Sequence, residues 1–201
     1  MRLPMLACLF LAAAACTHAT GARLPPDGDL VRPALVQTLP PDSILWSQRR
    51  RLSWSDFRAA PQIGAYPSAV TSYVLTYTST CDSKGFTSRV DAAFMPRQSW
   101  VKTSVVLLGP ASRRALQHEQ THFDLAEIDA RRIRRALASL ATPCEMTSDE
   151  RNAVVARFMQ EDEEIQERYD RESVHGIDAE RQGDWESTVA RQLAALARYR
   201  N

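Results

Sequence analysis

The segment LQHEQTHFDLAE, residues 116–127, places two histidines four positions apart, with a glutamate directly after the first histidine. It belongs to a longer stretch, residues 112–140, in which residues at helical spacing form one stripe: Ala115, His118, His122, Ala126, Ile133, Leu137 and Leu140. This period predicts a long amphipathic helix with both histidines on its buried face. The rest of the fold must therefore supply the surfaces that cover this stripe.

Strand-like sequence precedes this helix, and two more helical stretches follow it. Residues 68–80 (SAVTSYVLTYTST) and 87–96 (TSRVDAAFMP) are rich in strand-forming residues and flank a turn signal at Gly85. Thr147 and Glu150 have capping-box spacing and predict a second helix that continues to about residue 171. Gly176 interrupts the pattern before a third helix, residues 179–199. We therefore expect an α+β fold, with a small N-terminal antiparallel sheet packed on the histidine-bearing helix and two further long helices.

The N-terminal segment resembles a secretory signal. Residues 1–22 contain Arg2, an apolar run and then small residues, and the run is too short to span a membrane as a helix. We therefore expect an exported protein that is periplasmic, outer-membrane-associated or secreted by a bacterium. A lipidated Cys16, which would anchor the chain to a membrane, is the alternative processing route. Residues 23–43 hold five prolines and predict an extended tether before a domain at residues 44–200.

Charge and cysteine content narrow the classes of partner. Without residues 1–22 the chain loses one of its 25 basic residues and none of its 24 acidic ones, so its formal net charge is zero. This balance argues against a nucleic-acid partner, although ARRIRRAL (130–137) crowds four arginines into a predicted helix end. Cys81 and Cys144 are the two cysteines outside the leader, and an exported chain most simply pairs them in a disulfide.

The two histidines have the spacing of metal ligands. Residues i and i+4 of a helix differ by about 40° in direction and about 6 Å in height, so His118 and His122 can reach one tetrahedral ion. Glu119 points about 100° away from His118, which lets its carboxylate act on a metal-bound water as a general base. The pattern predicts a catalytic Zn²⁺ site, whereas two histidines packed in the core are the alternative.

A catalytic zinc usually has three protein ligands, so a third is needed. His175 is the one other histidine outside the leader, and it lies in the glycine-broken segment between the second and third helices. The rival ligands are four carboxylates: Glu127, Asp129, Glu163 and Glu164. Helical geometry turns Glu127 away from His122 and places Asp129 too far along the axis.

Three further residues are expected to support the site. Asp129 and Asp162 are acids on apolar faces, which need partners, and each can hydrogen-bond a ligand histidine or pair with an arginine. Tyr169 is the residue we expect to donate a hydrogen bond to the oxyanion that develops during hydrolysis. A core aromatic with a solvated hydroxyl is the alternative for Tyr169.

Two segments carry a family resemblance. LQHEQTHFDLAEIDARRIRRAL (116–137) and YDRESVHGIDAERQGDW (169–185) resemble the bacterial secreted family known as domain of unknown function 922, regarded as zinc-dependent proteases of the HExxH, or zincin, superfamily. The likeness extends to LSWSDF (52–57) and SWV (99–101). Ser173 stands where the family usually has threonine, and FRAAP (57–61) lacks the glycine of the family pattern, but neither departure affects a metal position. The resemblance implies a zinc-peptidase fold around His118, Glu119, His122 and His175.

Together these features predict a secreted zinc peptidase in which Glu119 activates a metal-bound water to hydrolyse an amide bond. The expected partner is a peptide or protein substrate, which binds by strand addition along residues 87–94. Cell-wall peptide is an alternative substrate. A non-enzymatic envelope protein with a structural or inactive zinc site is the alternative from a different class, and a purely structural site has no need of Glu119.

Overall fold

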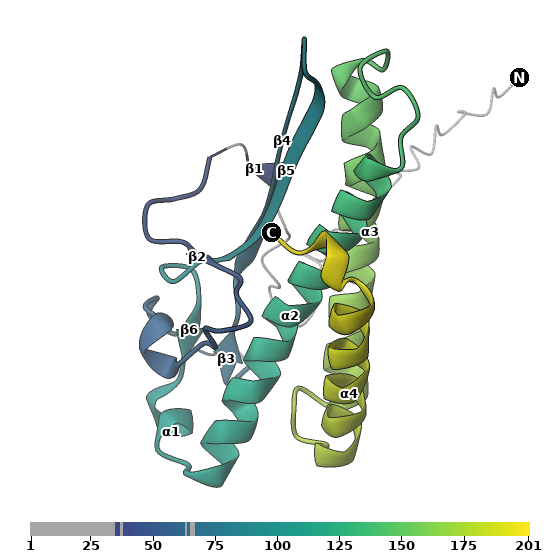
Figure 1. Ribbon diagram of the computed structural model, residues 1–201. Coiled ribbons are helices and arrows are strands. Elements are labelled where there is room, and N and C mark those ends of the chain that lie inside the picture. The colour runs from purple at the N-terminus through teal and green to yellow at the C-terminus, as the bar shows by residue number, and fades with distance from the viewer. Residues whose placement is uncertain (1–34, 37, 63, 65–66) are drawn as a thin grey trace, which may run out of the picture.

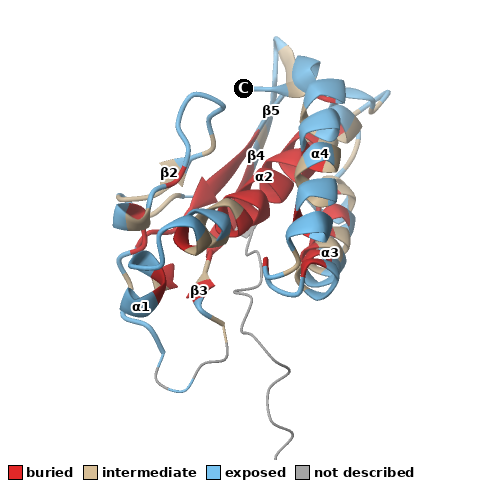
Figure 2. Cartoon of the chain, turned by 90° about the horizontal axis from the view of Figure 1, so that it is seen from below, coloured by how far each residue is buried: buried red, intermediate tan, exposed pale blue. Residues whose placement is uncertain are grey.

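The computed structural model describes residues 35–36, 38–62, 64 and 67–201. The expected leader, Cys16 and most of the tether lie outside these residues. The fold is α+β, as predicted: helix α2 (Pro110–Ala138) lies between a β-sheet on one side and helices α3 (Ser148–Ser173) and α4 (Ala179–Ala195) on the other (Figures 1 and 2). None of the helices in the described part of the chain has the length and apolar character needed to cross a membrane.

The sheet is built on a long hairpin. Strands β4 (Tyr73–Asp82) and β5 (Gly85–Phe94) pair antiparallel along their whole length, and β2 (Ile44–Leu45) is antiparallel to β5. The short strand β1 (Leu35–Val36) is the one exception to the expected antiparallel sheet, because it pairs parallel with β4. A separate two-stranded ribbon joins β3 (Ala69–Val70) to β6 (Trp100–Val101).

The edge of β5 that faces away from β4 is less open to a substrate strand than we expected. Strand β2 pairs with the residues at positions 93 and 94, and the backbone nitrogen of Trp46 donates to the Ala92 carbonyl at 2.9 Å. The Val90 carbonyl accepts hydrogen bonds from Arg134 Nε and Asn201 Nδ2, at 2.8 and 3.0 Å. The carbonyls that strand addition would use are therefore already occupied along this part of β5.

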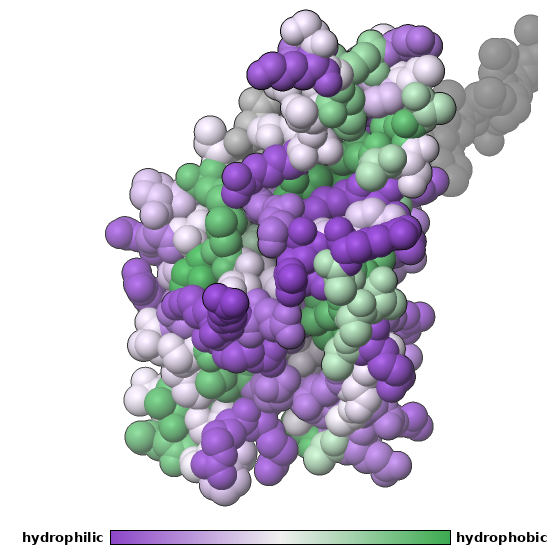
Figure 3. Space-filling model, in the orientation of Figure 1, coloured by the Kyte–Doolittle hydropathy of each residue, from purple (hydrophilic) through white to green (hydrophobic). Residues whose placement is uncertain are grey.

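Helix α2 is buried on nearly every side. It begins two residues before the predicted start, with Pro110 in its first turn after Gly109, whose φ is +57°. Every residue from 118 to 131 is buried (Figure 2). A helix of this kind belongs at the centre of a fold, because solvent-facing helices keep one polar face. The short helix α1 (Thr103–Val106) precedes it, and apolar surface gathers over α1 at the lower left of Figure 3, where Val106, Leu107 and Leu108 are exposed.

The two other long helices begin where the sequence predicts. Thr147 Oγ1 accepts a hydrogen bond from the Glu150 backbone at 3.2 Å, and the Glu150 carboxylate accepts one from the Thr147 backbone at 2.7 Å. This reciprocal pair confirms the capping box at the start of α3. Asp178 caps α4 through its side chain, and a final 3₁₀ turn, Ala197–Tyr199, follows that helix.

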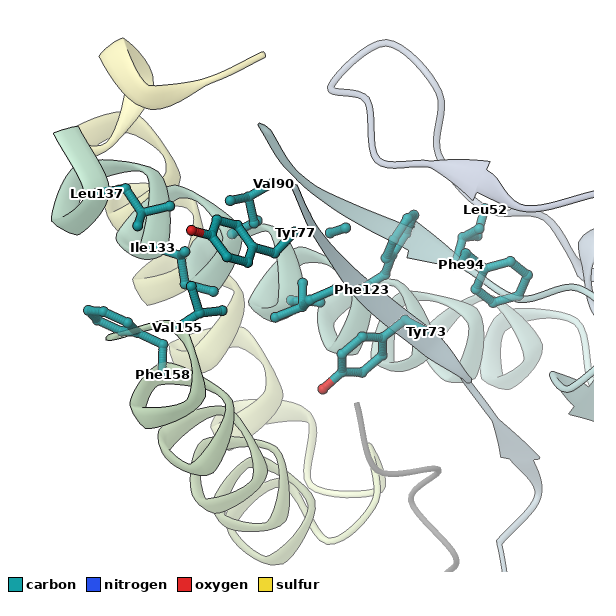
Figure 4. Packing of buried hydrophobic residues seen from close by; sticks show 14 of the residues in the cluster. Leu52, Tyr73, Tyr77, Val90, Phe94, Phe123, Ile133, Leu137, Val155 and Phe158 are labelled. Atoms are coloured by element: carbon teal, nitrogen blue, oxygen red, sulfur yellow. The ribbon is translucent and has the colours of Figure 1, made fainter. Parts of the chain in front are cut away.

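Two apolar clusters hold the layers together. The larger lies between the sheet and helices α2 and α3, and Figure 4 shows Phe94 of β5 and Phe123 of α2 in it, with ring centroids 5.9 Å apart. The smaller cluster joins the three long helices and consists of Leu125, Ile128, Tyr169, Val189 and Leu196. Tyr169 brings this second cluster directly against the histidines of α2, since its ring centroid is 4.7 Å from that of His118.

Cys81 and Cys144 form the predicted disulfide. It ties the end of β4 to the loop between α2 and α3, which places the far end of the hairpin beside the helices (Figure 1). The two cysteines are 63 positions apart in the sequence. A loop of that length gives an upper figure of about 4 kcal/mol of stabilisation in the chain-entropy model.

Candidate metal site

His118 and His122 meet inside the protein, at the face of α2 that packs on α3. Both side chains are buried, and their Nε2 atoms lie only 3.2 Å apart. A neutral imidazole carries a lone pair on one of its two ring nitrogens, and two such lone pairs repel at this distance. A proton on one of the two Nε2 atoms, or a cation shared by both, would turn this contact into a favourable one.

Asp170, near the end of α3, completes a triangle with the two histidines. Its Oδ1 atom lies 3.0 Å from the Nε2 atoms of both His118 and His122. In a tetrahedral zinc site with bonds of about 2.0–2.1 Å, neighbouring ligand atoms are roughly 3.3 Å apart. The three donor atoms thus already have nearly the separations that one zinc ion requires.

His175 joins the group from the turn after α3. Val174, His175 and Gly176 have φ values of +50°, +53° and +77°, so three consecutive residues adopt the left-handed conformation. This turn brings His175 Nδ1 to 3.6 Å from Asp170 Oδ1. His118, Asp170 and His175 each offer a ligand atom within 4.8 Å of the others. The structure therefore brings all three predicted histidines together, and we call His118, His122, Asp170 and His175 the histidine cluster.

Gly176 makes the turn possible for two reasons. Its positive φ is strained for any residue with a side chain. A Cβ atom at this position would also lie 2.9 Å from both Cβ and Cγ of His118, closer than real Cβ contacts allow. The turn therefore packs directly on the first histidine of α2.

Opposite charges organise the histidine cluster. Burial alone would lower the pKa of His122, but the charge and hydrogen bond of Asp170 outweigh it and raise that pKa to about 9. Burial would raise the pKa of Asp170, but the charge of His122 and hydrogen bonds from three histidines hold it well below the usual range. The hydrogen bond to Asp170 also raises the pKa of His175. A proton on His122 thus supplies the positive charge that a metal ion would otherwise supply.

Two glutamines fix the other ring nitrogens of the α2 histidines. The Oε1 atom of Gln166 lies 2.6 Å from His122 Nδ1, and that of Gln182 lies 3.3 Å from His118 Nδ1. An amide oxygen only accepts hydrogen bonds, so each Nδ1 atom must carry the proton. In a neutral ring this leaves the lone pair on Nε2, which is the nitrogen that faces Asp170.

Glu119 lies beside the cluster but outside the triangle. Its side chain is buried, and its charge contributes to the raised pKa values of His122 and His175. Thr71, next to strand β3, donates a hydrogen bond to the Glu119 backbone carbonyl at 3.1 Å, which ties this turn of α2 to the ribbon. Solvent reaches the cluster from the other side, where the His175 side chain is 36% exposed and that of Asp170 is 13% exposed.

One family model matches most of the chain. Residues 49–176 match the family model described as bacterial protein of unknown function (DUF922). The chain belongs to this family. The matched region contains the whole histidine cluster and ends at Gly176, so α4 and Gln182 lie beyond it. Neither the curated proteins nor the solved structures include a match.

In this DUF922 chain, Tyr169 packs against both histidines of α2. Its hydroxyl donates to Gln182 Oε1 at 2.7 Å, and its ring stacks on His118 with an interplanar angle of 25°. The residue is fully buried, and burial raises the pKa of its hydroxyl. The hydroxyl therefore contacts the same amide oxygen that faces Nδ1 of His118. The geometry favours an orienting role over the oxyanion role expected from the sequence.

Asp129 and Asp162 lie behind the DUF922 site, and neither hydrogen-bonds a histidine directly. Asp129 accepts from Arg132 at 2.6 Å and is hydrogen-bonded to Asp162, and burial together with Asp162 raises its pKa to about 8. Asp162 accepts from Tyr73 at 2.5 Å and from Gln166 at 3.2 Å, and burial raises its pKa. Asp129 therefore has the arginine partner weighed from the sequence, while Asp162 reaches His122 only through Gln166.

The rival carboxylate Glu127 also has a different role. It pairs with Arg131 at 2.8 Å and with Arg134 at 3.1 Å on its own helix. Asp170 is the member of the cluster that sequence reasoning did not include, and the two glutamines were missed with it. One signal was available: Asp162 and Gln166 are polar residues on the apolar face of α3, one turn apart and one turn before Asp170.

Proposed function

We propose that this protein is a zinc-dependent peptidase of the zincin type. His118 and His122 would hold the metal with a third ligand from the end of α3, and Asp170 lies closer to both of their Nε2 atoms than the His175 expected from sequence. The triangle of donor atoms, with sides of 3.0, 3.0 and 3.2 Å, is the observation that carries the proposal. The donor set of two imidazoles and a carboxylate suits zinc.

Glu119 and His175 would have different roles in the proposed hydrolysis. When bound, zinc would lower the pKa of a coordinated water and polarise an amide carbonyl. Glu119 would take the proton of the attacking water and pass it to the leaving nitrogen, because it is adjacent to the cluster but outside the ligand triangle. The side chain of His175 would meet the substrate first, because it is the most exposed member of the cluster.

The test separates metal binding from hydrolysis. Elemental analysis of the purified protein should find about one zinc per chain, as for a mononuclear site. Glu119→Gln should keep that zinc and lower hydrolysis of a broad substrate such as casein by roughly 100- to 10,000-fold, the usual contribution of a general base. Glu164→Gln, on an exposed position of α3, is the matched control and should change neither quantity. A parent protein that holds no zinc after refolding with excess zinc overturns the proposal.

A structural zinc site in a non-enzymatic envelope protein is the second candidate, and one observation favours it. The cluster offers four ligand-bearing residues, and a zinc with four protein ligands has no position left for water. In that case neither the parent nor Glu119→Gln would hydrolyse a substrate, and removal of the zinc by a chelator would destabilise the fold. Cell-wall peptide in place of protein is a question of substrate alone, because the same residues would cleave either one. The proposed export of the protein rests on residues 1–22.

A further inference from the structure

The two glutamines of the site belong to a motif that occurs twice. On α3, Asp162 and Gln166 are four residues apart, and on α4, Gln182 and Glu186 are four residues apart. In each pair the glutamine nitrogen donates to the carboxylate, at 3.2 Å on α3 and 2.9 Å on α4. In each pair the glutamine oxygen faces Nδ1 of one histidine of α2.

The contacts leave each amide only one orientation. Gln166 Nε2 also donates to the backbone carbonyl of His122 at 3.1 Å, and a carbonyl oxygen cannot donate in return. Gln182 Nε2 faces Glu186, and Gln182 Oε1 accepts from the Tyr169 hydroxyl at 2.7 Å. A flipped amide would place nitrogen against donors and oxygen against acceptors. Both amides therefore present oxygen to the histidines.

We propose that Gln166 and Gln182 are positioning residues that hold His122 and His118 in the Nδ1–H form, with both Nε2 lone pairs directed at one point. Helices α3 and α4 each supply one carboxylate–glutamine pair for one histidine. The inference rests on the proposed metal site for its consequence, but the hydrogen bonds themselves do not depend on a metal. Gln166 should matter more, because its contact is 2.6 Å long against 3.3 Å for Gln182.

The choice of glutamine has an electrostatic reason. A carboxylate in direct contact with Nδ1 would favour a doubly protonated ring, which has no lone pair for a metal. Asp170 and Glu119 already bring two negative charges to this site. A neutral amide oxygen orients the ring without a further charge, and the carboxylates of Asp162 and Glu186 stay one residue away from the rings.

The first experiment measures zinc affinity by competition with a chelator. Gln166→Leu removes the hydrogen-bond acceptor at similar volume and should weaken zinc binding by roughly 10- to 100-fold, the usual effect of losing such a partner. Gln182→Leu should weaken it less. Gln160→Leu, an exposed position of the same helix as Gln166, is the matched control and should leave affinity unchanged. Gln166→Glu restores an acceptor oxygen but brings a charge to Nδ1, so it should recover only part of the loss and leave zinc affinity below that of the parent.

The second experiment needs no metal and separates this inference from the proposed function. In metal-free protein the buried Nδ1 proton of His122 should exchange slowly and give a resolved imidazole N–H resonance by NMR. Gln166→Leu should abolish that resonance and leave the corresponding His118 resonance in place. If Gln166→Leu lowers stability but keeps this resonance, and zinc affinity equals that of the Gln160→Leu control, Gln166 has only a structural role and the inference is overturned. A parent without zinc affinity would overturn the proposed function, while the NMR comparison would still decide this one.

Discussion

Two buried polar clusters lie on α2, little more than one turn apart, and they differ in how they are satisfied. The histidine cluster is one. The other, which we call the arginine cluster, consists of Glu127, Arg131 and Arg134, with Trp46 packed under the Arg131 guanidinium at 5.0 Å. The α2 residues of both clusters are almost fully shielded from water, since His118 and His122 are each 4% exposed and Glu127 and Arg131 are each 3% exposed.

The arginine cluster is complete as it stands. Arg131 donates to Glu127 at 2.8 Å and to the Leu193 carbonyl at 2.7 Å, so positive groups meet negative or neutral acceptors. The histidine cluster brings together a carboxylate oxygen and two ring nitrogens that can all bind one cation. Burial of polar residues therefore does not by itself mark a ligand site. The histidine cluster differs in that electron pairs of three atoms converge, and a proton on His122 balances them.

The largest expected effect comes from breaking the arginine cluster. Arg131→Ala leaves Glu127 as a buried charge that has lost its closest partner, which should lower the free energy of unfolding by about 3–5 kcal/mol. Zinc bound per folded molecule should not change, because this cluster is already satisfied within the protein. Denaturant titration and metal analysis measure the two quantities. Arg135→Ala, an exposed arginine of the same helix, serves as the control and should cost less than about 0.5 kcal/mol.

Substitutions in the histidine cluster, in contrast, should lower zinc affinity. Asp170→Ala removes an atom 3.0 Å from two histidine nitrogens, and zinc affinity should fall by more than the roughly 100-fold upper figure for loss of an outer hydrogen-bonding partner. Metal-free stability should fall too, because Asp170 is the main partner that raises the pKa of His122, so the loss of zinc is what distinguishes this variant from Arg131→Ala. The zinc affinity of His175→Ala, measured by competition with a chelator, should be compared with that of Asp170→Ala. An equal or larger loss in His175→Ala would restore His175 as the third ligand, and retained zinc in Asp170→Ala would contradict our assignment.

A smaller effect concerns pH. In metal-free protein the pKa of His122 is about 9 against an ordinary value of 6.5, so its stabilising contribution is full below pH 6.5 and lost as pH rises through 9. The pKa of Asp129 is about 8 against 3.8, so the folded state keeps a proton that the unfolded chain releases above pH 3.8, and stability again falls as pH rises toward 8.

Both groups therefore predict lower stability of the metal-free protein at pH 9 than at pH 6. Asp129→Asn removes the second contribution and should show a smaller decline, measured by denaturant unfolding at both pH values with a chelator present. A decline as steep as that of the parent would show that Asp129 does not share a proton with Asp162. Saturating zinc should reduce the part due to His122, because a metal-bound imidazole cannot take up that proton.

The smallest effect tests an acid of α3 that sequence reasoning could not dismiss. Glu164 is exposed on the same helix as Asp170, so Glu164→Ala should change stability by no more than about 0.5 kcal/mol and leave zinc affinity at the parent value. The same chelator competition measures it. Loss of zinc in this variant would mean that α3 rotates on metal binding and that the described triangle is not the bound arrangement.

Local patterns in the sequence were enough to predict the helices and part of the site. The capping box at Thr147 and the stripe through His118 and His122 depend on residues three to eight positions apart, and such spacings directly predict local geometry. The cysteine pairing followed from having only two cysteines outside the leader. The approach of His175 followed from a count of histidines, since no local rule relates it to α2.

The rest of the site depends on contacts between distant segments. Asp170 meets His122 across 48 positions, and Gln166 meets it across 44, because α3 folds back antiparallel on α2. The polar residues Asp162 and Gln166 on the apolar face of α3 indicate which side of this helix is buried, but they do not show which distant segment that side will meet. The parallel pairing of β1 with β4 was likewise invisible, because two residues are too few to produce a strand pattern.

The left-handed turn at residues 174–176 also limits which substitutions the histidine cluster can tolerate. Gly176 packs so closely on His118 that an added Cβ atom would lie 2.9 Å from the Cβ and Cγ atoms of that histidine, so the turn restricts the rotamer of His118. A single added methyl group would have to displace either the ring or the backbone that carries His175, and both lie in the cluster. Substitutions meant to alter the surface beside the cluster should therefore leave this glycine alone and use its exposed neighbours Val174 and Ile177.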